Sequence, residues 1–431
     1  MSEERIQPRP YLKLLLLTAL LGLFSAAVTF VFMVLVAAGQ GLIWEQAAAA
    51  SGLALPVFTI MVCTVGGLVV GILVKVFGDH SGIFAEIIAE FGITGRFNYR
   101  HAPGIVLTGL VSLIAGGSLG PEAPMADACG SAGTWLADRL KLDARSTRSL
   151  GYSGLSGMLA AFITSPFGGA VLSLESARAG ISYPWTLFPS LLASAVGTTV
   201  FVMLTGAFFG QLYAFPDYQP VLKDLLLAVP LGLVGALAGA IFILAIAWLR
   251  KVMQPLRQHV ILRGAIGGLI LGIAGALMPL ILFSGEEQTK VLIDQAAQIG
   301  AATLIVLAVV KLLITSLLLV SGWKGGYIFP TMFAGVALGM AVNLIFPDIP
   351  LAVAVSATMA GAMVTTMKAP IFSAMLVVVL VQLETSPVVA IAVIVGLLAT
   401  ARLSMTSGMA REQRTKDEEQ ASPAEAAEVA G

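Results

Sequence analysis

Long apolar stretches recur along this chain, and they restrict the folds that it can adopt. Four of them, at residues 14–39, 56–77, 225–249 and 264–283, are long enough to cross a hydrocarbon core of about 30 Å as helices. Hydrophobic residues make up 58% of the 431 residues and charged residues only 11%, unlike an ordinary soluble domain. The sequence therefore predicts an all-helical, multi-pass protein of the cell membrane, surrounded by the lipid bilayer.

Several other apolar segments are too short to cross a bilayer. They lie between Gly, Pro or charged residues, at 104–117, 122–138, 148–163, 166–178 and 370–384. Broken helices are tolerated at membrane depth only where they line a protected or water-filled cavity. We therefore expect half-membrane helices whose ends line such a cavity.

Basic residues at the ends of the apolar segments predict the orientation of the chain. They are Arg5, Arg9, Lys13, Arg96, Arg100, Arg139, Lys141, Arg145, Arg148, Arg250, Lys251, Arg257, Arg402, Arg411 and Arg414. The positive-inside rule places these ends, and both termini, in the cytoplasm. After a cytoplasmic segment at 1–10, the first apolar run is about twice as long as a signal-peptide core, so it is expected to stay as an anchor. The charged tail at 411–431 is expected to be disordered.

The two halves of the chain resemble one another around their Gly and Pro breaks. Pro124 and Pro330 lie 206 positions apart, and Pro166 and Pro370 lie 204 apart. Two pairs with almost the same offset argue for a duplication, and such repeats are commonly inverted in the membrane. The sequence predicts a first transmembrane repeat at 11–215 and a second at 216–410.

One carboxylate interrupts the apolar sequence at the first of these breaks. Residues 116–124 read GGSLGPEAP and contain Glu122. A carboxylate at bilayer depth is costly unless it faces a cavity, becomes neutral or finds a partner, so it usually marks an ion or proton route. Because prolines suit the first turn of a helix, we expect a helix to begin at Glu122 inside the membrane. Two such helix starts, one in each half, would present free N–H groups that bind an anion.

Three pentapeptides resemble, in order, the signatures of the CLC family of chloride channels and proton-coupled chloride exchangers. The family's GSGIP, GK/REGP and GxFxP correspond here to HSGIF at 80–84, GPEAP at 120–124 and GYIFP at 326–330. The resemblance covers roughly residues 10–405. It implies a CLC-like fold of two inverted repeats, one pore per chain, a homodimer, and no C-terminal regulatory domain.

The resemblance also implies a central site for a dehydrated anion, chloride or another small one. The Ser81 hydroxyl would bind it together with backbone N–H groups of the two helix starts. The implied anion-binding positions are Ser81, Gly82, Ile83, Glu122, Ala123, Pro124, Ile328 and Phe329. Glu122 would be the gate, because its ionised carboxylate imitates an anion in the outer part of the pathway and swings away when protonated. Partial charges alone would hold a halide loosely enough to release it.

Simpler roles stay open for some of these residues. Ser81 could instead be the N-cap of the helix that carries Glu86 and Glu90. Glu122 could be a surface glutamate favoured by a helix N-terminus. Asp127 is expected to be a solvated or hydrogen-bonded helix residue rather than part of the route.

The sequence departs from the family at three places. Ile328 stands at the Phe position of GxFxP, and the C-terminal helix expected at 397–410 lacks the tyrosine that commonly coordinates the central anion. The internal proton-transferring acid of the exchangers aligns with Ser176, next to Glu175. Since a serine hydroxyl does not titrate near neutral pH, we expect channel-like or loosely proton-coupled anion transport, with Ser176 and Glu175 as the positions relevant to coupling.

The remaining polar residues are assigned structural roles. Glu175 is expected to pair with Arg178 one turn on, and Lys311 to extend its charge toward the membrane surface. His80 is expected to be hydrogen-bonded near the inner mouth, where it could respond to pH. The two cysteines, Cys63 and Cys129, should be buried and inert. The three histidines have no metal-ligand spacing, no cofactor is expected, and a net charge of zero suggests no nucleic-acid partner.

Other classes of function stay open. A proton-coupled exchanger of chloride, fluoride or another anion would use the same site. A carrier of cations or organic solutes would need several intramembrane acids at one place, whereas this chain offers Glu122 among small and hydroxyl residues. A membrane-embedded enzyme could use Ser81 with His80, or Glu122, but adjacent residues cannot easily form a nucleophile–base pair on one helix face. The sequence favours a transport protein and no enzymatic activity.

Overall fold

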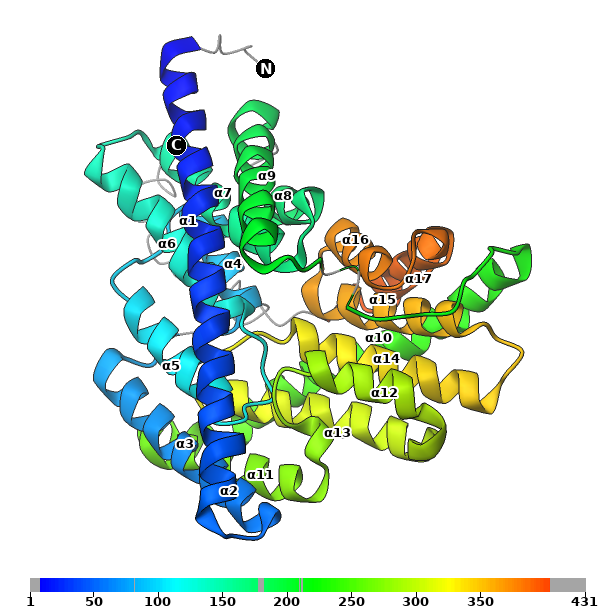
Figure 1. The fold of residues 1–431 in the computed structure, drawn as a ribbon. Coiled ribbons are helices and arrows are strands. Elements are labelled where there is room, and N and C mark those ends of the chain that lie inside the picture. Colours follow the sequence, from blue (N-terminus) through cyan, green and yellow to red (C-terminus); the bar gives the residue numbers. More distant parts are fainter. Residues whose placement is uncertain (1–7, 81, 177–181, 209, 211, 404–431) are drawn as a thin grey trace, which may run out of the picture.

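The computed structural model describes residues 8–80, 82–176, 182–208, 210 and 212–403, and Figure 1 shows them as an arrangement of helices. The α-helices are α1 (Pro8–Gln40), α2 (Ala48–Ser51), α3 (Leu55–Phe77), α4 (Phe84–Thr94), α5 (Ala102–Ile114), α6 (Glu122–Arg139), α7 (Ala144–Ile163), α8 (Pro166–Ser176), α9 (Phe188–Thr205), α10 (Leu222–Val252), α11 (Val260–Leu277), α12 (Glu286–Ile299), α13 (Ala301–Val320), α14 (Ile328–Ile345), α15 (Leu351–Met367), α16 (Pro370–Leu380) and α17 (Ser386–Ala399). Short π-helical stretches lie at Gly41–Ala47 and Tyr183–Leu187, and 3-10 turns at Gln254–Leu256, Pro279–Ile281 and Leu383–Thr385.

Within the described ranges, 7 helical segments are long and apolar enough to cross a membrane. They are Pro8–Ser51, Leu55–Phe77, Tyr183–Thr205, Leu222–Val252, Val260–Leu277, Ala301–Val320 and Ile328–Ile345. Many of their outward side chains are large and hydrophobic, such as Met203 (81% exposed) and Leu222 (80% exposed), as expected of a surface that faces lipid rather than water. The prediction of an all-helical, multi-pass membrane protein is confirmed.

One predicted span ends earlier than expected. The apolar stretch at 264–283 predicts a single helix, but α11 ends at Leu277. Met278 has φ −138° and ψ 79°, which is extended rather than helical. It precedes Pro279, whose ring disfavours a helical conformation in the residue before it. The last part of the predicted span is therefore a turn and a loop.

The short helices lie where the short apolar segments predict them. α6 begins at Glu122, α8 at Pro166 and α16 at Pro370, so each starts at or within two residues of a proline that cannot continue a preceding helix. α5 and α7 fill the other two short segments.

The four helices α6 to α9 have counterparts in α14 to α17, in the same order along the chain. The residue that follows α7 is Thr164 (φ 46°), and the residue that follows its counterpart α15 is Lys368 (φ 55°). Left-handed conformations are uncommon for such residues, so their presence two positions before both Pro166 and Pro370 supports a true repeat. In Figure 1 the first set, cyan to green, lies at the upper left, and the second, yellow to orange, at the right. The outer limits of the repeats, 11–215 and 216–410, stay a prediction.

The core of the molecule lies where the two sets of helices meet. The largest fully buried side chains include Trp323, Tyr327, Phe329 and Phe333, which lie at or just before the start of α14. Since bulky side chains fill this junction, the backbone of the second helix break is rigidly placed.

Candidate functional site

The two helix breaks meet at one point. The N–H of Gly120 donates to the carbonyl of Gly326 at 2.8 Å, and the N–H of Gly326 donates to the carbonyl of Gly120 at 2.6 Å. α6 begins two residues after Gly120 and α14 begins two residues after Gly326. This bridge between residues of opposite halves brings two helix N-termini to the same place.

Glu122 lies between these two helix starts. Its side chain is 1% exposed, and its Oε1 accepts a hydrogen bond from the N–H of Phe329 at 3.2 Å. Its Oε2 is buried with no hydrogen-bond partner among the described residues. A carboxylate of the first half therefore occupies the start of a helix of the second half, where backbone N–H groups and the helix dipole favour an anion.

Glycines make room for this carboxylate. A Cβ atom added to Gly326 or to Gly120 would overlap with Glu122 Oε2. No other residue could stand at either position without moving the carboxylate. The glycines of the two pentapeptides thus shape the space around Glu122 as well as permitting the breaks.

A cavity opens beside Pro121, the residue before Glu122. It has a volume of about 490 Å³ and is lined by residues that include Gln40, Trp44, Pro121, Phe283 and Glu286. Pro121 precedes Glu122 directly, and Glu286 is close enough to interact with Glu122 electrostatically. The cavity thus leads from the neighbourhood of Glu122 toward the C-terminal end of α1.

The other positions implied by the resemblance are placed as follows. Ala123, Pro124, Ile328 and Phe329 are buried beside Glu122, in the first turns of α6 and α14. Gly82 and Ile83 are buried just before α4.

Ser81 itself lies outside the described residues. Ile83 has the N-cap backbone position of α4, and both expectations for Ser81, a contact with the anion and a cap of this helix, stay predictions.

Tyr327 was missed by the sequence analysis. Its side chain is 0% exposed, its hydroxyl has no hydrogen-bond partner within the described parts of the chain, and its ring lies 5.4 Å from that of Phe242 between centroids. It lies close enough to Glu122 and Glu86 to interact with both electrostatically. Its place directly after Gly326, inside the second helix break, was the signal that could have identified it.

Glu175 binds the start of a helix of the opposite repeat. Its Oε1 accepts from the N–H of Ile371 at 2.6 Å and its Oε2 from the N–H of Phe372 at 2.8 Å, both in the first turn of α16. Arg178, its expected partner, lies outside the described residues. Each of the two carboxylate oxygens of Glu175 accepts a hydrogen bond from α16, and the pair with Arg178 stays a prediction. Ser176 is the half-buried last residue of α8.

The expectation for Lys311 was wrong. Its side chain is 0% exposed, and its Nζ donates to the carbonyls of Ile281, Leu282 and Phe283 at 3.0, 3.1 and 2.8 Å. The turn that follows α11 supplies these carbonyl acceptors, so the ammonium group finds partners inside the protein and does not extend toward the surface.

Asp127 is a helix residue, as expected, but one of its two carboxylate oxygens is not satisfied by the described residues. It is 6% exposed, and its Oδ2 is buried with no hydrogen-bond partner in the described part of the chain, so this oxygen is neither solvated nor hydrogen-bonded. Asp127 lines a second cavity of about 120 Å³ together with His80 and His101, whose rings stack at 3.4 Å between centroids.

The expected hydrogen bond of His80 is present, between its Nε2 and the carbonyl of Phe77 at 3.1 Å. Cys63 and Cys129 are buried, as predicted.

Known proteins share this sequence pattern and architecture. The family described as "Voltage gated chloride channel" matches residues 66–401. YfeO of Escherichia coli (strain 55989 / EAEC), a protein named for ion transport, is 28% identical over 361 residues, which cover 82% of this chain and 84% of YfeO.

Solved structures show the same fold. A CLC-type fluoride/proton antiporter superposes with a TM-score of 0.78 at 19% identity, covering 94% of this chain and 99% of its own. A slow cyanobacterial Cl⁻/H⁺ antiporter gives a TM-score of 0.80 at 20% identity, covering 96% and 100%. A eukaryotic CLC transporter gives 0.74 at 16% identity, covering 91% and 73%.

The matched region includes both helix breaks and the bridge between them, and it spans most of the chain. The chain therefore belongs to the CLC family, the voltage-gated chloride channel family of membrane ion-transport proteins.

Proposed function

We propose that the protein transports chloride or another small anion across the cell membrane, along a pathway that passes the starts of α6 and α14, with Glu122 as its gate. One observation carries this proposal: Glu122 accepts the Phe329 N–H through one oxygen while the other oxygen lies buried without a partner among the described residues. A carboxylate at a helix start that leaves one of its oxygens unpaired is open to replacement by an anion that takes the same N–H group.

Protonation is the step that would release the gate. A neutral carboxyl group is a weaker acceptor for the Phe329 N–H than a carboxylate, and it gains nothing from the helix dipole. The cavity of about 490 Å³ lined by Pro121, the residue before Glu122, is the space toward which the side chain would move. The emptied N–H groups would then bind a halide through partial charges, loosely enough for it to leave again.

The region of Glu175 supports channel-like or loosely coupled transport. Ser176 has no titratable group near neutral pH, and both oxygens of Glu175 accept hydrogen bonds from α16. Neither residue offers a carboxylate that is free to carry a proton.

Proton-coupled exchange of chloride or fluoride is the second candidate. Two of the similar solved structures are titled as antiporters of these anions with protons. Glu286, which lines the cavity beside Pro121, could supply protons to Glu122 in such a cycle.

We also propose a homodimer with cytoplasmic termini, built from repeats at 11–215 and 216–410. Basic residues at the C-terminal ends of α6 (Arg139) and α10 (Arg250 and Lys251) support this orientation. Crosslinking in native membranes would test the dimer, and cysteine accessibility at each terminus would test the orientation.

Anion flux from proteoliposomes tests the function directly. Purified protein should release chloride with a rate that rises as the pH falls, because protonation empties the gate. A proton gradient imposed without a chloride gradient should drive little chloride in a channel and strong uphill chloride movement in a coupled exchanger. Protein that releases no chloride, fluoride or bromide above empty liposomes would contradict the proposal.

A further inference from the structure

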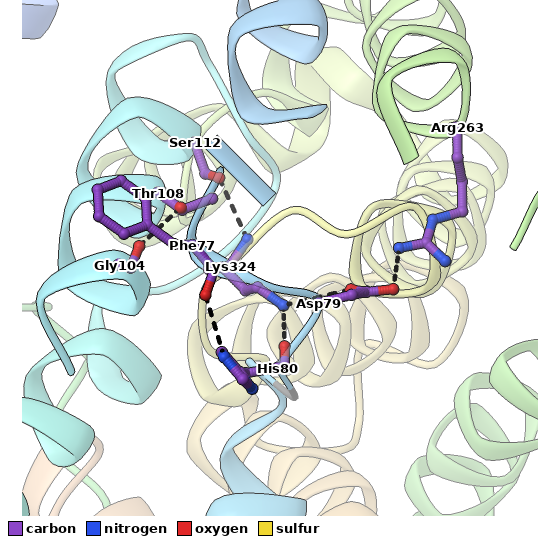
Figure 2. Close-up of polar contacts among 8 residues, drawn as sticks. All are labelled: Phe77, Asp79, His80, Gly104, Thr108, Ser112, Arg263 and Lys324. Atoms are coloured by element: carbon purple, nitrogen blue, oxygen red, sulfur yellow. Dashed lines mark hydrogen bonds and ion pairs between the residues drawn. The ribbon is translucent and has the colours of Figure 1, made fainter. Parts of the chain in front are cut away.

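A buried charged cluster lies beside the backbone that leads to Gly82. Figure 2 shows Asp79 of the segment after α3, Arg263 of α11 and Lys324 of the segment before α14 pointing toward one another. Arg263 Nη2 donates to Asp79 Oδ2 at 2.6 Å, and Lys324 Nζ lies 3.9 Å from Asp79 Oδ1. Lys324 Nζ also donates to the carbonyl oxygen of His80. We call Asp79, Arg263 and Lys324 the Lys324 cluster.

The Lys324 cluster has one more positive charge than it has carboxylates. Lys324 is 4% exposed and Arg263 is 7% exposed, while the side chain of Asp79 is 40% exposed. Glu86, the other acid that acts on Lys324 electrostatically, forms its own ion pair with Arg250. Two buried cations therefore share one half-exposed carboxylate. Because burying an unbalanced charge is costly, the cluster favours a mobile anion nearby.

Lys324 joins the two segments that carry the candidate anion positions. It stands two residues before Gly326, and its backbone N–H donates to Ser112 Oγ at 3.2 Å, which fixes its place (Figure 2). Its side chain lies across Gly82, where an added Cβ atom would overlap with Lys324 Cδ. The charge is thus held against the 82–83 backbone by packing and by the His80 carbonyl.

We propose that Lys324 supplies a full positive charge to the His80 side of the anion pathway, so that a monovalent anion binds more tightly beside Gly82, and that Asp79 limits this attraction. This inference rests on the proposed anion transport. A unit charge acts over about 10 Å before salt screens it, whereas the partial charges of a helix start act mainly within its first turn. Lys324 is thereby a residue that sets anion affinity, distinct from the gate at Glu122.

A purely structural role makes a different prediction. If Lys324 only ties His80 and Asp79 to the second half, removal of either charge would loosen the same contacts, and both substitutions would impair transport in the same direction. If Lys324 acts through its charge, substitutions of opposite sign must have opposite effects.

The structural and the electrostatic role of Lys324 can be separated by measuring chloride flux in proteoliposomes, from low to saturating chloride concentrations. Lys324→Gln should raise the half-saturating chloride concentration by about three- to tenfold, and Asp79→Asn should lower it by a similar factor. Lys223→Gln is the control: Lys223 is an exposed lysine in the first turn of α10, and its loss should leave the half-saturating concentration unchanged. Thermal unfolding of each purified variant checks that it is folded.

The outcomes are distinguishable. The role of Lys324 would be overturned if the half-saturating chloride concentration rose in both Lys324→Gln and Asp79→Asn, or shifted in neither. Anion transport itself would stand in both cases. If Lys324→Gln fails to fold, Asp79→Asn decides alone, and an unchanged or raised value would overturn the inference. Absence of anion flux in the unsubstituted protein would overturn both this inference and the proposed function.

Discussion

Glu122 and Glu175 make the same kind of contact, but they differ in how many of their carboxylate oxygens accept a hydrogen bond. Each is a carboxylate of the first half that binds the start of a helix in the second half, α14 for Glu122 and α16 for Glu175. Glu175 accepts one N–H on each oxygen, at 2.6 and 2.8 Å, and is half-buried. Glu122 accepts one at 3.2 Å, is 1% exposed, and has a second oxygen without a partner in the described residues.

This difference distinguishes Glu175, which caps α16, from Glu122, the proposed gate. A carboxylate that accepts two charge-assisted hydrogen bonds is stabilised where it is, and leaving costs about 3 kcal/mol or more. A buried carboxylate with an unpaired oxygen carries a desolvation penalty of about 1–3 kcal/mol, which weakens its hold on the site. A helix start occupied by a carboxylate is therefore a candidate gate only where that carboxylate is incompletely satisfied.

The largest expected effect is that of Glu122→Gln. The amide is neutral at every pH, so it should compete with an anion for the Phe329 N–H much more weakly than the carboxylate does. Chloride flux at neutral pH should rise about tenfold, and its pH dependence should disappear. Glu384→Gln, the same change at an exposed position in the turn Leu383–Thr385, is the matched control and should leave both properties unchanged. Flux with the original magnitude and pH dependence in Glu122→Gln would show that the gate lies elsewhere.

Gly326→Ala tests the same site without touching the carboxylate. The added methyl group overlaps with Glu122 Oε2, so the folded variant must displace the side chain from the Phe329 N–H. Its flux should therefore resemble that of Glu122→Gln, at a stability cost of about 1–3 kcal/mol for overpacking. A folded variant that keeps the original pH dependence would mean that the carboxylate position does not control access.

Tyr327→Phe should have an intermediate effect. The hydroxyl is buried without a partner in the described part of the chain, so its removal costs the empty protein little. If it donates to the anion, chloride affinity measured by calorimetric titration should fall about two- to tenfold. Unchanged affinity together with higher thermal stability would make Tyr327 a packing residue only.

Glu175→Gln should have the smallest effect on transport. It weakens the cap of α16, so the free energy of unfolding should fall by about 1–2 kcal/mol in a chemical denaturation experiment. Chloride flux per folded protein, and any proton movement that accompanies it, should stay the same. Loss of proton movement in this variant would remove the distinction between the two carboxylates and make Glu175 a proton-transferring acid.

Local sequence patterns predicted where the helices break, but they did not predict the contacts between residues far apart in the sequence. Apolar stretches, Gly and Pro were enough to place the starts of α6, α8 and α16, because those signals act within a few residues. The contact of Glu175 with α16 joins residues 196 apart, and that of Lys324 with His80 joins residues 244 apart. Such contacts depend on how the two halves pack, which no local pattern contains. The end of α11 before Pro279 was a local signal that a count of apolar residues overlooked.

The central claim is that Glu122 and the transported anion compete for the same N–H group. Bromide is a suitable probe, because its anomalous X-ray scattering identifies it in a crystal. Crystals of Glu122→Ala soaked in bromide should show an anomalous peak within hydrogen-bond distance of the Phe329 N–H, where the carboxylate stands in the unsubstituted protein, and crystals of the unsubstituted protein at neutral pH should show none there. Bromide that binds only away from the Phe329 N–H in both proteins would contradict the account.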